Sequence, residues 1–104
     1  MADANRLLVW SPEAEQDLLE IWAYLAGEAS PHVADVCLGD IDNACRHLEE
    51  WPLSGRPRNE LMYGLRSILA RSYVVLYRVA DHGVEIIRVI HGKRDIDAIF
   101  REVD

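Results

Sequence analysis

Hydrophobic residues along this chain follow two patterns, one with helical spacing and one typical of strands. A short apolar run at residues 7–10 precedes Ser11 and Pro12, which are preferred residues at the start of a helix. Apolar side chains then recur every three or four residues, which predicts an amphipathic helix after a short strand. The apolar face comprises Ala14, Leu18, Ile21, Trp22, Leu25 and Ala29.

A second helix is predicted from Ser30-Pro31, which repeats the Ser-Pro start of the first. It ends at Trp51-Pro52, because a proline and the residue before it disfavour helical backbone. The short connection between the two helices predicts an antiparallel helical hairpin. The apolar positions of the second helix are Val33, Cys37, Ile41, Ala44, Cys45 and Leu48.

The second half of the chain has strand-like patterns. Residues 53–59 are predicted to be a loop from their Gly and Pro content, and strands follow at 65–70, 73–79 and 84–91. The middle strand is apolar on both faces, so both faces must be covered. The helical hairpin can cover one face, and the other needs the C-terminal segment or a partner chain. Residues 95–102 are predicted to form a short last helix capped by Asp95.

This order predicts an α+β domain: an N-terminal strand and an antiparallel helical hairpin packed on a small antiparallel sheet, with a short C-terminal helix. The 104 residues suit a single hydrophobic core, so residues 1–104 are predicted to form one domain. Hydrophobic residues make up 50% and charged residues 28%, a composition typical of globular proteins and not of disordered ones.

The sequence also indicates which kinds of site and location to exclude. No apolar stretch is long enough to span a bilayer, and the polar N-terminus is unlike a secretory signal, so a cytoplasmic protein is predicted. Cys37 and Cys45 would lie roughly 12 Å apart along one helix, too far for a disulfide. No set of Cys and His residues has the spacing of a zinc site. We therefore expect two buried thiols and neither metal nor cofactor.

The net charge of −7 is unevenly distributed. Residues 1–52 contain 11 acidic and 2 basic residues, whereas residues 53–104 contain 7 acidic and 9 basic residues. A molecule divided in this way is expected to turn its cationic side toward an acidic partner. Sequence-specific binding of nucleic acid is not expected, because it usually needs a large basic surface.

Four stretches of the chain resemble one known family in order and spacing. They are residues 10–18 (WSPEAEQDL), residues 51–57 (WPLSGRP), GLR at 64–66 with YVVLYRV at 73–79, and VEIIRVIHGKRD at 84–95. These motifs are similar to those of the ParE toxins of toxin–antitoxin systems, also called plasmid stabilisation proteins. The resemblance extends over nearly the whole chain and implies the RelE-like fold, in agreement with the element order above.

The resemblance implies a ParD-like antitoxin, whose C-terminal segment wraps the toxin in a hetero-oligomer, and DNA gyrase as the target. ParE toxins have no established catalytic residue. We expect toxicity to depend on the last strand and tail, through Arg88, His91, Lys93, Arg94 and Phe100. The expected antitoxin contacts are Arg56, Arg58, Arg66, Tyr73, Tyr77, Arg78, Arg88 and Arg94. Trp22 could anchor the antitoxin with the two tyrosines; its mid-helix position predicts that it is the most buried of the three.

The same superfamily contains RelE-type toxins that cut messenger RNA on the ribosome, which gives a second interpretation. In an RNA-cutting enzyme His91 could act as acid or base and Arg66 or Arg78 could bind a phosphate, with Glu60 as a further candidate. Each residue also has a structural interpretation. His91 can cap a backbone group or pack on a tyrosine, and the arginines alternate with apolar residues as solvent-facing strand residues do.

Overall charge favours the binding interpretation. Ribosome-directed members of the superfamily are strongly basic, whereas this chain has a pI near 5.0 and a single lysine, Lys93. We therefore predict a toxin that works by binding and is not an enzyme. A third interpretation is an inactive toxin fold that only binds its antitoxin; it differs from the first only in whether expression inhibits growth.

Overall fold

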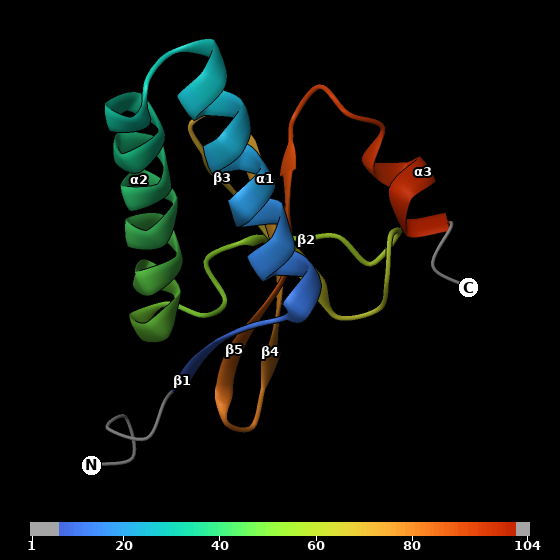
Figure 1. Ribbon diagram of the computed structural model, residues 1–104. Coiled ribbons are helices and arrows are strands. Elements are labelled where there is room, and N and C mark those ends of the chain that lie inside the picture. Colours follow the sequence, from blue (N-terminus) through green and yellow to red (C-terminus); the bar gives the residue numbers. More distant parts are fainter. Residues whose placement is uncertain (1–6, 102–104) are drawn as a thin grey trace.

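The computed structural model describes residues 7–101, and its helices and strands are labelled in Figure 1. In chain order they are β1 (Leu7–Trp10), α1 (Pro12–Glu28), α2 (Pro31–Glu50), β2 (Arg56–Pro57), β3 (Leu65–Ala70), β4 (Tyr73–Ala80), β5 (Gly83–His91) and α3 (Ile96–Arg101). Every predicted helix and strand is present, with ends close to those predicted. The segment predicted as a loop, residues 53–59, contains the additional short strand β2.

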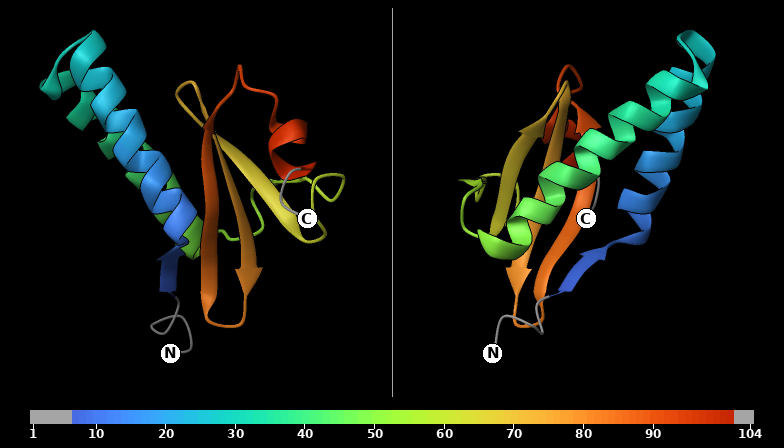
Figure 2. Two further views of the ribbon diagram at one scale, coloured as in Figure 1. Left: turned by 45° about the vertical axis from the view of Figure 1, so that its right-hand side comes forward. Right: turned by 90° about the vertical axis from the view of Figure 1, so that its left-hand side faces the viewer.

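Both long helices begin as the Ser-Pro pairs predict. The Oγ atom of Ser11 accepts a hydrogen bond from the backbone N of Ala14 at 3.0 Å, and that of Ser30 accepts one from Val33 at 3.1 Å. These bonds give partners to N–H groups that the first turn of a helix leaves free. The helices form the predicted hairpin, whose turn extends away from the sheet (Figure 2). Ala29 and Val33 are exposed for this reason, although both belong to the predicted apolar faces.

The sheet has the strand order β1-β5-β4-β3-β2. Pairing is antiparallel within β2, β3, β4 and β5, but β1 runs parallel to β5, with Leu7 opposite Gly83. The predicted small antiparallel sheet is confirmed for β2–β5, and the N-terminal strand adds a parallel pair at its edge. Alternation of residues indicates a strand but not its direction, which depends on a partner more than 70 residues away in the chain.

Both faces of the sheet are covered, as the two-sided apolar pattern of β4 predicts. Val75 and Tyr77 face the hairpin of α1 and α2, whereas Leu76 faces the opposite way, toward α3. Figure 2 shows the sheet between these two layers. The C-terminal segment covers the second face, together with Leu61 from the loop before β3. The residues that pack there from outside the sheet are Leu61, Ile96, Ile99 and Phe100.

The prediction that Trp22 is more buried than Tyr73 and Tyr77 was wrong. Both tyrosines are buried on the central strand, whereas Trp22 is only half-buried. Helix α1 directs Ala14 and Ile21 toward the core, and Trp22 lies at its side facing α2. There its Nε1 donates a hydrogen bond to Oδ1 of Asp35 at 2.8 Å.

Cys37 and Cys45 are buried and free, as predicted. Burial raises the pKa of Cys45 to about 12, so this thiol stays protonated and unreactive at neutral pH. Within residues 7–101, no helix is long and apolar enough to cross a membrane. The same residues contain no cluster of three or more His, Cys, Asp or Glu side chains that could hold a metal ion.

Tyr77 fixes the loop that leads into β2. Its hydroxyl donates a hydrogen bond to the carbonyl of Pro52 at 2.7 Å and accepts one from the backbone N of Gly55 at 2.9 Å. A Cβ atom at Gly55 would lie 2.4 Å from this hydroxyl, so only glycine permits the contact. Arg66 Nη1 donates to the carbonyls of Leu53 and Gly55 at 3.1 and 2.7 Å. The loop is therefore held against β3, where β2 forms.

Replacing Tyr77 with phenylalanine is expected to lower the free energy of unfolding by about 1–3 kcal/mol, because the Pro52 carbonyl and the Gly55 N–H lose their partner. Urea denaturation measures this change. The matched control is Tyr63→Phe, which removes the same hydroxyl from a side chain that is 93% exposed. The control should change stability by less than about 0.5 kcal/mol. Equal losses of unfolding free energy in the two variants would show that the Tyr77 hydroxyl does not stabilise the loop before β2.

Candidate functional site

Helix α1 is attached to the edge of β5 by side-chain hydrogen bonds. β1 pairs with β5 only as far as Ile86. Beyond that point the Oγ of Ser11 donates to the carbonyl of Ile87 at 2.8 Å, and Oδ2 of Asp17 accepts from the backbone N of Val89 at 2.9 Å. The side chains of Ser11, the N-cap residue of α1, and of Asp17 thus bond backbone groups that a neighbouring strand would otherwise pair.

Asp17 also forms a two-point ion pair with Arg88. Nε of Arg88 lies 2.7 Å from Oδ2 of Asp17, and Nη2 lies 2.9 Å from Oδ1. The Asp17 side chain is 8% exposed and the Arg88 side chain 23% exposed, so water screens the pair only partly. Hydrogen bonding to Asp17 raises the pKa of Arg88. The main role of Arg88 in the structure is therefore to hold α1 on the sheet.

On one side of this ion pair lies a groove of about 540 Å³, which we call the α1–β5 groove. One wall carries Glu20 and Tyr24 of α1, and the opposite rim carries Lys93 and Arg94. Among residues 7–101, the side chains of Lys93 and Arg94 have no hydrogen-bond or ion-pair partner, and Tyr24 is 64% exposed. Free cations beside an exposed aromatic ring suit an acidic protein segment. Asp17, Ile21, Tyr73, Val89 and His91 complete the lining.

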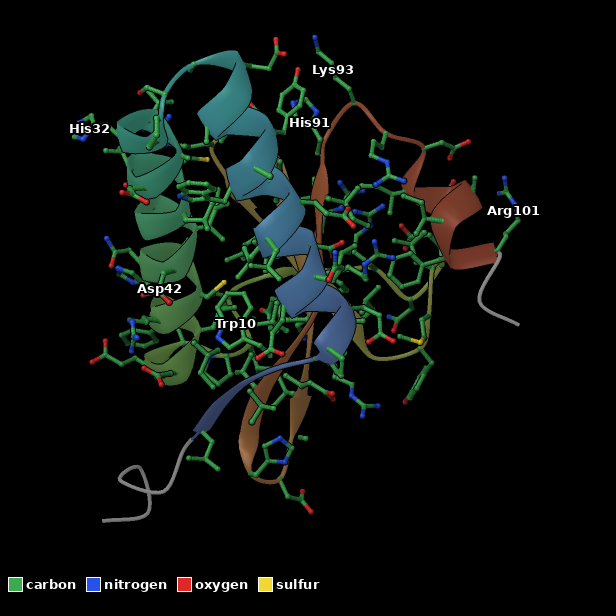
Figure 3. The ribbon with its side chains drawn as sticks, viewed as in Figure 1. Trp10, His32, Asp42, His91, Lys93 and Arg101 are labelled. Carbon is green, nitrogen blue, oxygen red and sulfur yellow. The ribbon has the colours of Figure 1, made fainter. Side chains whose placement is uncertain are left out.

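His91 has both structural roles that were weighed for it. Its ring makes an edge contact with the ring of Tyr73, with centroids 5.2 Å apart and planes at 81°. Its Nδ1 accepts a hydrogen bond from the backbone N of Lys93 at 3.1 Å. Figure 3 shows His91 and Lys93 at the same end of the sheet, beside the C-terminal half of α1. His91 thus shapes the turn that presents Lys93.

The four residues considered for RNA cleavage are not brought to one site. His91 lies opposite the first residue of β4, and Arg78 is five residues further along that strand, roughly 17 Å away at a rise of about 3.4 Å per residue. Arg66 is bound to the loop before β2. Glu60 pairs with Arg58 at 2.7 Å, and this hydrogen bond lowers the pKa of the Glu60 carboxyl. A lowered pKa makes Glu60 a weak base near neutrality.

The residues predicted to contact an antitoxin are spread over the molecule. Arg56 on β2 and Arg94 on the α1–β5 groove are exposed and have no ion pair with any described residue. Arg78 is bound to Glu85 at 2.8 Å, and Arg58, Arg66 and Arg88 are bound as given above. Tyr73 and Tyr77 lie in the core, where a partner cannot reach most of either side chain.

Two residues of the groove were not singled out from the sequence. Asp17 lies on the apolar stripe of α1 between Ala14 and Ile21, and a carboxylate at such a position is a signal of a buried ion pair. Tyr24 lies outside that stripe, and no local pattern marks it. Its importance comes from its place opposite Lys93 and Arg94.

Comparison with known proteins places this fold and these residues in a family. A family model described as the ParE toxin of type II toxin-antitoxin system, parDE, matches residues 8–96. The chain belongs to the ParE toxin family. The resemblance noted in the sequence is thereby confirmed. The matched range runs from β1 to the first residue of α3.

The individual relatives of this chain include toxins named ParE and a toxin named RelE. Toxin ParE1 of Mycobacterium tuberculosis is 31% identical over 88 residues, which cover 84% of this chain and 90% of the relative. Toxin RelE2 of Caulobacter vibrioides is 33% identical over 87 residues, covering 84% and 96%. A solved structure described as the chromosomal ParDE TA system from P. aeruginosa superposes with a TM-score of 0.74 at 21% identity, covering 84% of this chain and 96% of that one. The predicted RelE-like fold is confirmed.

Removal of the Arg88 charge tests the attachment of α1. Arg88→Met is expected to lower the free energy of unfolding by about 2–4 kcal/mol, because Asp17 would keep a nearly buried charge without its cation. Arg46→Met is the matched control: it breaks an ion pair with Asp42 on the surface of α2, where the arginine side chain is 62% exposed. The control should cost less than about 1 kcal/mol by urea denaturation. A loss at Arg88 no larger than at Arg46 would show that the pair does not hold the helix.

Proposed function

We propose that this ParE toxin pairs with a ParD-like antitoxin, which neutralises it in a hetero-oligomer by placing an acidic segment in the α1–β5 groove. The observation that supports this most is that Lys93 and Arg94, beside exposed Tyr24, have no side-chain partner among residues 7–101. A chain with net charge −7 repels an acidic partner over much of its surface, so free cations define where such a partner can bind. A cytoplasmic location is part of the proposal.

The residues proposed to contact the antitoxin differ in exposure and in whether they already have a partner within the toxin. Arg94 and Arg56 are exposed and free to pair with carboxylates. Arg58 and Arg78 would first exchange their present partners, Glu60 and Glu85. Tyr77 would act indirectly, since it is buried and holds the loop before β2. We therefore propose Arg94 and Lys93 as the principal direct contacts.

We infer further that the toxin inhibits DNA gyrase by binding and is not an enzyme. The family resemblance suggests this target, and the wide separation of His91 from Arg78 supports a mechanism without acid–base catalysis. Lys93 and Arg94 belong both to the proposed toxic segment and to the groove. An antitoxin in the groove would then cover part of the surface that the toxin needs for its target.

RNA cleavage is retained as a second candidate because of the 33% identity with Toxin RelE2. Expression of the chain alone separates the possibilities. Gyrase inhibition predicts loss of DNA supercoiling and a DNA-damage response, whereas RNA cleavage predicts rapid messenger cleavage with intact DNA. Normal growth with confirmed expression of folded protein would indicate an inactive toxin fold. In vitro, the purified chain is expected to inhibit supercoiling by gyrase; full gyrase activity at saturating toxin would contradict the proposal.

The double variant Lys93→Glu/Arg94→Glu tests the groove. It is expected to weaken binding of the antitoxin, taken from the neighbouring gene, by about a hundredfold in Kd, or about tenfold for each reversed charge. The measurement is isothermal titration calorimetry. The matched control, Arg46→Glu/Arg101→Glu, makes the same change in net charge at exposed positions outside the groove. Similar weakening of antitoxin binding in both variants would show that the net charge of the toxin matters, and that the α1–β5 groove is not the binding site.

A further inference from the structure

A second hollow lies on the other side of the Asp17–Arg88 pair, and we call it the α3 pocket. Its volume is about 390 Å³, within the range of about 300–1,000 Å³ that is typical of ligand-binding pockets. The first turn of α1, the loop before β3, strand β5 and helix α3 form its walls. Most of its lining is apolar: Leu61, Met62, Ile87, Ile99 and Phe100. Ile99 and Phe100 lie outside the part of the chain that the family model matches.

Two charged residues, Glu13 and Arg88, also line the α3 pocket. Arg88 uses Nε and Nη2 to bind Asp17, which balances its charge, and its Nη1 has no hydrogen-bond partner among residues 7–101. Glu13 is exposed and makes no hydrogen bond or ion pair with any residue in that range, but its charge helps to raise the pKa of Arg88. Because Asp17 already balances the charge of Arg88, the charges of Glu13, Arg88 and Asp17 sum to a negative value, the opposite of the Lys93–Arg94 rim of the α1–β5 groove.

We propose that the α3 pocket binds a peptide segment in which a large apolar side chain stands next to a lysine or arginine. The apolar side chain lies against Met62, Ile87 and Phe100, and the basic group pairs with Glu13. Nη1 of Arg88 donates to a backbone carbonyl of the segment. These contacts use the polar groups that line the pocket, and the carboxylate of Glu13 repels an acidic ligand.

The α3 pocket and the proposed antitoxin site differ in the charge of the segment that each would bind. An acidic segment suits the α1–β5 groove, whereas an apolar and basic segment suits the α3 pocket, and the Asp17–Arg88 pair forms the wall between them. Two different partners, or two different segments of one partner, can therefore occupy the toxin together. The inference goes beyond the proposed function and holds whether or not gyrase is the target.

Three capped dipeptides test the pocket on the whole chain: N-acetyl-Phe-Arg-amide, N-acetyl-Phe-Gln-amide and N-acetyl-Phe-Glu-amide. In NMR titrations the Arg probe should shift the methyl signals of Met62, Ile87 and Ile99 in a saturable manner. It should bind about fivefold more tightly than the Glu probe, the size expected of an exposed ion pair. Glu13→Gln should reduce this preference to less than about twofold. Met62→Ala should weaken all three probes.

The matched control is Glu20→Gln, which removes a carboxylate from the α1–β5 groove and should leave the preference for the Arg probe unchanged. Equal binding of the Arg and Glu probes would overturn the proposal, as would a preference that survives in Glu13→Gln. Absence of saturable shifts at millimolar probe would also overturn it. Shifts of the pocket methyl signals with protein concentration alone would identify a second copy of the chain as the occupant instead.

Discussion

The ion pair between Asp17 and Arg88 holds α1 against the part of β5 that β1 leaves unpaired. Three donors converge on the Asp17 carboxylate, two from the guanidinium and one from the backbone N of Val89. A nearly buried carboxylate is stable only with such partners. Because α1 is fixed at this place, its first turn forms one wall of the α3 pocket and its later turns form one wall of the α1–β5 groove. Both candidate surfaces thus depend on one interaction.

The two faces of the sheet are covered by the chain's own helices, so an exposed sheet face is not a reason to expect an antitoxin. The two-sided apolar pattern of β4 requires cover on both faces, and the structure supplies it with the helical hairpin on one and α3 on the other. Within residues 7–101, the apolar side chains of β4 on both faces are therefore covered by the chain itself, apart from Val79, which is 42% exposed. The case for an antitoxin therefore rests on electrostatics and on the family. Lys93 and Arg94, which have no partner among residues 7–101 on a chain of net charge −7, are the cations proposed to bind the acidic segment of the antitoxin.

The partners of His91, Glu60 and Arg78 are relevant to the choice between gyrase inhibition and RNA cleavage. Members of the ParE and RelE groups share a fold, and this chain resembles Toxin ParE1 and Toxin RelE2 to a similar degree. A shared fold does not distinguish gyrase inhibition from RNA cleavage, because function depends on the arrangement of particular side chains. His91 is engaged by Tyr73 and Lys93, Glu60 by Arg58, and Arg78 by Glu85. Each of these side chains is thus bound to a residue outside the set considered for RNA cleavage.

Local patterns in the sequence determined the helices, their serine caps, the free thiols and the two-sided burial of β4, because spacing and capping act over a few residues. The family resemblance and the concentration of charge near the C-terminus singled out Lys93, Arg94 and Phe100 as expected toxicity residues. Only the tertiary structure decided that β1 runs parallel to β5 and that Tyr77 is more buried than Trp22. It also decided that Arg88 is bound to Asp17, while Lys93 and Arg94 have no side-chain partner within residues 7–101. These features depend on contacts between residues as far apart as Asp17 and Arg88, which no local spacing encodes.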